Sequence, residues 1–95
     1  MLMSRNDTVT VADTSGKVLE AQERKFLYIR NSSSAGEKIT LVLNNSVAAV
    51  SNEGIVLSPG QAFVETDSES FKCWRGEVQA ISDVAGATIS ISERD

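Results

Sequence analysis

The stretch Thr88-Ile89-Ser90-Ile91-Ser92 alternates strictly between hydroxyl-bearing side chains and isoleucines. Because successive side chains of a β-strand point to opposite faces of a sheet, this pattern predicts a strand with one buried and one solvent-facing side. Thr8-Val9-Thr10-Val11 repeats the pattern near the beginning of the chain, and residues 38–43 alternate in the same way. Alternation with period two dominates the sequence and predicts an all-β fold.

Two other segments indicate where strands and loops lie. Residues 25–30 carry apolar side chains at both odd and even positions between charged ends, which predicts a central strand buried on both faces. Residues 18–24 are good helix formers, but no N-cap pattern precedes them. We therefore expect a strand over residues 17–19 and a connecting loop after it.

Turn signals separate the expected strands. In Ser58-Pro59-Gly60-Gln61, proline and then glycine suit the two central positions of a type II turn. Asp13-Thr14-Ser15-Gly16 predicts a hairpin in which Gly16 supplies a positive φ. Strands repeating every eight to twelve residues or so predict a small antiparallel β-sandwich or a jelly-roll-like barrel. We expect one such domain over residues 8–95, preceded by a short N-terminal arm over residues 1–7.

The composition excludes several classes of function. The chain has 95 residues, 13 acidic and 9 basic side chains, one cysteine and no histidine. Without histidine there is no imidazole for acid–base catalysis, and one cysteine cannot form an internal disulfide. The net charge of −4 disfavours nucleic acid as a partner, and no apolar run is long enough to cross a membrane. We expect no enzyme, no catalytic residue, no cofactor and no metal.

Several residues could nevertheless carry a site. Glu65-Thr66-Asp67-Ser68-Glu69 places carboxylates at alternate positions, but the spacing does not match the twelve-residue calcium loop, so a solvated loop is preferred. Cys73 has no histidine to activate it and is expected to pack as a small buried side chain. Trp74 and Phe63 are expected in the core, whereas Phe71 lies in a polar stretch and is expected to be exposed.

The N-terminus begins with an apolar tip, Met1-Leu2-Met3, followed by polar residues. Methionine and leucine side chains adapt well to a partner surface, which suits an arm laid on another protein. A frayed terminus is the alternative interpretation. The residues that we predict to make assembly contacts are Met1, Leu2, Met3, Arg5 and Phe71.

Four segments follow one another in a characteristic order of strands and turns. They are residues 24–33, in which a basic and hydrophobic strand is followed by Asn-Ser, then Gly54-Ile55-Val56-Leu57-Ser58-Pro59-Gly60, and finally residues 76–81 with residues 86–93. This order resembles small virion proteins of tailed bacteriophages over residues 24–93. The resemblance implies a β-sandwich or jelly-roll decoration (cement) protein, or a domain of a head-fibre protein, bound to the capsid exterior.

The resemblance also implies a role and partners. Such a protein is a non-enzymatic structural component, made in the cytoplasm of the bacterial host and located on the virion. Its partner would be the major capsid protein or another virion protein, and we expect its copies to associate as dimers or trimers. A head–tail or tail component is the alternative within the virion. The competing class is a carbohydrate-binding sandwich with Trp74, Tyr28 or Phe71 as its platform.

Overall fold

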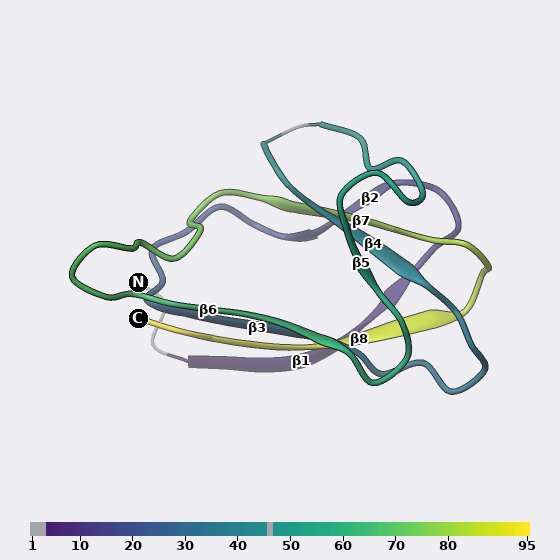
Figure 1. Cartoon of the computed structure of the whole chain (residues 1–95), viewed down its shortest axis with the longest axis horizontal. Helices are drawn as coiled ribbons and strands as arrows, with labels where there is room; N and C mark the ends of the chain where they lie inside the picture. Colours follow the sequence, from purple (N-terminus) through teal and green to yellow (C-terminus); the bar gives the residue numbers. More distant parts are fainter. Residues whose placement is uncertain (1–3, 46) are drawn as a thin grey trace.

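The structure, a computed structural model, describes residues 4–45 and 47–95, which form eight β-strands and no helix (Figure 1). The strands are β1 (Ser4–Val11), β2 (Gly16–Leu19), β3 (Phe26–Asn31), β4 (Ile39–Leu43), β5 (Ile55–Leu57), β6 (Ala62–Thr66), β7 (Val78–Ser82) and β8 (Ala87–Arg94). The all-β prediction is confirmed. The described ranges accordingly hold no helical segment that could span a membrane.

The strands form two four-stranded antiparallel sheets, which Figure 1 shows as two layers. Sheet A has the order β1-β8-β3-β6, and sheet B has the order β2-β7-β4-β5. The antiparallel pairs are nested, because β1 pairs with β8, β2 with β7, β3 with β6 and β4 with β5. Eight strands paired in this way over two sheets have the jelly-roll topology. The predicted sandwich is confirmed.

The hydrophobic core lies between the two sheets. Ile89 and Ile91, the isoleucines of the alternating stretch, have at most 2% of their surface exposed, so the predicted buried side of that strand is confirmed. Each fully buried side chain of this size contributes roughly 1.5–3 kcal/mol to folding. The buried cluster comprises Val11, Leu19, Leu27, Ile29, Ile39, Leu41, Leu57, Cys73, Val78, Ala80, Ala87, Ile89 and Ile91.

Strand β3 is central in sheet A, between β8 and β6, as predicted for residues 25–30. The expectation that both of its faces are buried is wrong. Leu27 and Ile29 are fully buried, whereas Phe26 and Tyr28 on the opposite face are only partly buried. The reason is that sheet B packs against one face of sheet A, and the described residues leave the other face open to solvent.

The start of the chain differs from the expectation in two places. Residues 4–7 of the expected arm belong to β1, whose pairing with β8 extends to Ser4 opposite Arg94, and Met1–Met3 lie outside the described residues. The segment Asp13–Gly16 does not close a hairpin, because β1 and β2 belong to different sheets. Gly16 is not among the residues with positive φ. By contrast, β2 confirms the strand expected over residues 17–19.

The predicted type II turn joins the two sheets. The Gln61 N–H donates to the Ser58 carbonyl at 2.9 Å, and Gly60 has a φ of +86°, as this turn requires. Asn31, at the end of β3, is fully buried and donates from Nδ2 to the Leu57 carbonyl at 2.9 Å. Its backbone carbonyl also accepts the Gly60 N–H at 2.8 Å. Asn31 therefore bonds the turn that connects β5 of sheet B with β6 to strand β3 of sheet A.

Candidate functional site

The acidic segment after β6 has a structural role. Glu65 Oε1 accepts the Trp74 N–H at 2.8 Å, and Asp67 Oδ1 accepts the Cys73 N–H at 2.7 Å. Asp67 Oδ2 also accepts a bond from Arg75 Nη2 at 2.8 Å. The interpretation as a solvated loop is therefore wrong for Glu65 and Asp67, which fasten the segment before β7. Among the described residues, no group of three or more Asp, Glu, Cys or His side chains is placed to hold a metal ion.

These bonds affect how the neighbouring groups titrate. The backbone N–H of Cys73 and the positive charge of Arg75 lower the pKa of Asp67, although partial burial opposes them. Burial and the nearby Glu65 carboxylate raise the pKa of the Cys73 thiol. Cys73 is 2% exposed and belongs to the hydrophobic core, as predicted. A buried thiol with a raised pKa is not a nucleophile at neutral pH.

The three aromatic residues named as candidates for a sugar platform in the alternative interpretation do not share one surface. Trp74 packs against the core, and its Nε1 donates to the Glu77 carbonyl at 2.9 Å. Tyr28 points away from the core on the opposite face of sheet A. Phe71 lies in the loop between β6 and β7 and is 45% exposed, so its predicted exposure is confirmed. Phe63 is partly buried against the core, close to expectation.

The predicted contact residue Arg5 is bonded within the chain. Its Nη2 lies 3.1 Å from Asp7 Oδ2, and its Nη1 lies 3.4 Å from Oε2 of the fully buried Glu93. Asp7 lies on β1 together with Arg5, so the ion pair with Glu93 is the one that joins β1 to β8, close to the C-terminus. Arg5 therefore supports the fold, and its part in assembly stays a prediction.

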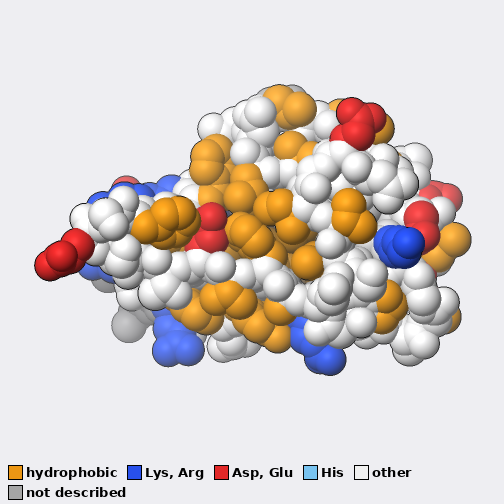
Figure 2. Space-filling view, viewed as in Figure 1, with side chains coloured by type: hydrophobic (Ala, Val, Ile, Leu, Met, Phe, Trp, Pro, Cys, Tyr) orange, Lys and Arg blue, Asp and Glu red, His pale blue; other side chains and the backbone are white. Residues whose placement is uncertain are grey.

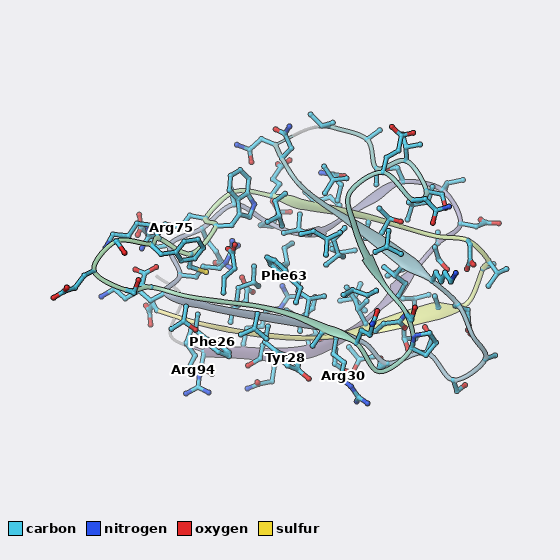
Figure 3. All side chains as sticks on the ribbon, viewed as in Figure 1. Phe26, Tyr28, Arg30, Phe63, Arg75 and Arg94 are labelled. Carbon is cyan, nitrogen blue, oxygen red and sulfur yellow. The ribbon has the colours of Figure 1, made fainter. Side chains whose placement is uncertain are left out.

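Sequence reasoning did not identify the most distinctive surface, the outer face of sheet A. The strand register places its side chains in rows across β1, β8, β3 and β6. Figure 3 shows Phe26, Tyr28, Arg30 and Arg94 projecting from this side of the sheet. The alternation of side chains along these strands, which predicted the buried positions, also marks the intervening positions that face outward here. The rows are Ser4, Arg94, Phe26 and Thr66; Asn6, Ser92, Tyr28 and Val64; Thr8, Ser90, Arg30 and Ala62.

The outer face of sheet A differs in charge from the whole chain. Its rows contain two arginines and no acidic residue, although the net charge of the chain is −4. In Figure 2, the lower border, where this face turns outward, shows basic but no acidic side chains. A shallow groove of about 390 Å³ runs beside Tyr28 and is lined by Asn6, Asp7, Thr8, Tyr28, Ser90, Ile91 and Ser92. This face can therefore receive an anionic group beside an aromatic ring.

A second surface, at sheet B, is apolar. The segment between β4 and β5 lies on the outside of this sheet, where the Asn52 N–H donates to Thr40 Oγ1 at 3.0 Å and leaves Thr40 2% exposed. This segment and β5 expose Val47, Val50 and Val56 to solvent, at 43%, 51% and 37%. We call these three residues the valine surface. Strand β5 is the edge of sheet B and pairs on one side only, with β4.

Comparison of the chain with models of protein families, with curated proteins and with solved structures finds no match.

Proposed function

We propose that the protein is a non-enzymatic structural component of a tailed-bacteriophage virion, a decoration (cement) protein bound to the outside of the capsid. The proposal begins from the resemblance of residues 24–93 to small virion proteins. The jelly-roll topology supports it, because viral capsid proteins are among the proteins built on this fold. Fold alone does not define a function, so the argument rests on a surface that could bind the shell.

The observation that carries the proposal is the valine surface beside the open edge of β5. Val56 belongs to β5 itself, and Val47 and Val50 belong to the segment that leads into this strand, and all three are exposed. Exposed apolar side chains that gather at one place are typical of a protein interface. The unpaired side of an edge strand can also add a strand from a partner by backbone hydrogen bonds. Both features suit attachment to a neighbouring protein.

Binding of this kind would stabilise the capsid by mass action. A protein that binds the assembled shell, and not its free subunits, shifts the equilibrium toward the shell. Several copies around a symmetry axis of the shell would form dimers or trimers, because closed oligomers follow the symmetry of their site. The partner is the major capsid protein or another protein of the virion.

Imaging of virions assembled with variant proteins tests this proposal. We expect Val50→Asp to lower the number of copies on each capsid severalfold, because it places a charge in the interface. Val84→Asp is a matched control, since Val84 is 49% exposed in the turn between β7 and β8, outside the valine surface. Equal occupancy for both variants would contradict the role of the valine surface. Density on the tail, or none on the particle, would contradict the capsid assignment.

A further inference from the structure

We infer that the outer face of sheet A binds an acidic saccharide, with the ring of Tyr28 against the sugar and Arg30 and Arg94 for its carboxylates. This site goes beyond the proposed attachment to the capsid, which uses sheet B. The argument rests on three properties of the outer face of sheet A: an aromatic ring, an array of small polar groups and an unbalanced positive charge.

The aromatic part of the site comes from β3. Phe26 and Tyr28 occupy alternate positions on this strand, so they lie about 6.7 Å apart along it. The guanidinium of Arg94 lies 5.2 Å from the centre of the Phe26 ring, which holds this cation over the sheet. Among residues 4–45 and 47–95, no guanidinium lies over the ring of Tyr28, which borders the groove. The C–H face of a sugar ring can pack on a partly exposed aromatic ring of this kind.

The polar part of the site comes from β1 and β8. Asn6, Ser90 and Ser92 line the groove beside Tyr28. Ser92 Oγ donates to Asn6 Oδ1 at 2.7 Å, which orients the amide and turns its N–H₂ group toward other partners. Within the described part of the chain, neither this N–H₂ group nor the Tyr28 hydroxyl bonds to protein. Short side chains with donors and acceptors fit the hydroxyl groups of a saccharide.

The charges of the site select an anion. Arg94 pairs with Phe26 in the register and Arg30 lies four residues beyond Phe26, so the two arginines are about 13 Å apart along the strands. An arginine can bind a carboxylate through two parallel hydrogen bonds. Asp7 borders the groove, but its carboxylate already accepts bonds from Arg5 and from the Thr8 N–H. The two arginines lie in the rows on either side of Tyr28, so the outer face of sheet A favours a carboxylate-bearing sugar over a neutral one.

A nucleic acid, which also combines rings with negative charge, fits this face less well. Binding to a continuous row of phosphates relies on many basic side chains, and the outer face of sheet A has two. A saccharide with separated carboxylates and many hydroxyl groups matches two arginines and several small polar side chains better.

Affinity gel electrophoresis of the purified full chain tests the inference without a virion. We expect polygalacturonate in the gel to retard the protein, and neutral dextran to leave its mobility unchanged. Arg30→Gln and Tyr28→Ala should each weaken the retardation constant about tenfold, as expected for the loss of one charge-assisted bond or one ring contact. Tyr28→Phe, which keeps the ring, should retain binding within about threefold.

The control is Lys38→Gln, which removes one exposed positive charge next to β4 of sheet B and should leave retardation by polygalacturonate unchanged. The inference is overturned if polygalacturonate does not retard the wild-type protein, or if Lys38→Gln weakens binding as much as Arg30→Gln. It is also overturned if polyglutamate or a single-stranded oligonucleotide retards the protein as strongly as polygalacturonate. Because no capsid takes part, this result is independent of the proposed function.

Discussion

Arg24 and Glu93 form an ion pair in which neither side chain has any exposed surface, with Arg24 Nε 2.8 Å from Glu93 Oε1. The remaining nitrogens of Arg24 donate to backbone carbonyls of Glu20, Trp74 and Gly76. One side chain thus joins β8 of sheet A to the loop after β2 and to the segment before β7. A buried charge is tolerated in a protein only when it is paired and hydrogen-bonded in this way.

Replacing one partner of this pair should destabilise the fold strongly. We expect Arg24→Met to lower the free energy of unfolding by about 3–5 kcal/mol, because Glu93 would keep a buried charge without its main partner. Urea denaturation followed by circular dichroism measures the change. The double variant Arg24→Met with Glu93→Leu should recover much of the loss, since it removes both charges. A single variant as stable as the wild-type protein would contradict this role of Arg24.

Replacing the buried Asn31 should lower the stability of the fold more than replacing an exposed asparagine. Asn31→Ala removes the two bonds from Nδ2, to the carbonyls of Leu57 at 2.9 Å and Glu37 at 2.8 Å. Leaving a buried polar group without a partner costs about 1–3 kcal/mol, and we expect a loss of stability in this range. The exposed Asn44 is the control, and Asn44→Ala should change stability by less than about 0.5 kcal/mol. Equal effects of the two variants in urea denaturation would contradict the prediction.

The two glycines Gly60 and Gly16 offer a matched test of the turn geometry. Gly60 has a φ of +86°, so Gly60→Ala should destabilise the protein by roughly 1–2 kcal/mol. Gly16 has no positive φ, and a Cβ there would meet no atom within 4 Å. Gly16→Ala should therefore be neutral or stabilising by up to about 1 kcal/mol. Thermal unfolding compares them, and a larger loss for Gly16→Ala would refute this account.

Asp67 should make stability depend on acid pH. Its bonds to the Cys73 N–H and to Arg75 lower the pKa of its carboxyl in the folded state. In the unfolded chain this carboxyl has the ordinary pKa of about 3.9. The stabilisation is therefore complete above the unfolded-state pKa and is lost as the pH falls through the lowered folded-state value.

We expect Asp67→Asn to flatten the fall of the thermal midpoint when the pH is lowered below about 4, relative to the wild-type protein. Glu69→Gln removes an exposed carboxylate from the same segment and is the control, which should follow the wild-type profile. If the thermal midpoints of Asp67→Asn and of the wild-type protein fall in parallel as the pH is lowered, the bonds of Asp67 do not contribute to stability.

Local pattern was sufficient for several features of the fold. The alternation around Ile89 and Ile91 correctly predicted which side chains are buried, and Pro59-Gly60 correctly predicted a type II turn. The exposure of Phe71 and the burial of Cys73 also followed from their neighbours in sequence. These features depend on a few adjacent residues, so the chain encodes them locally.

Features that depend on distant residues were missed or misread. The turn Asp13–Gly16 has the composition of a hairpin, yet β1 pairs with β8 from the other end of the chain. Glu93 is 69 residues from Arg24, and nothing in either local segment marks them as partners. The candidate saccharide site combines side chains of β1, β3 and β8, which only their pairing in sheet A brings together.

The sequence by itself determined most of the strands, the principal turn and the buried face of strands such as β8, because alternation with period two follows from local backbone geometry. Only the tertiary structure decided which strands are neighbours, which sheet each joins and which polar side chains meet. The physical reason is that strand pairing satisfies hydrogen bonds and buries apolar surface between segments far apart in the chain. That arrangement alone gathers Tyr28, Arg30 and Arg94 on one face and places Arg24 against Glu93.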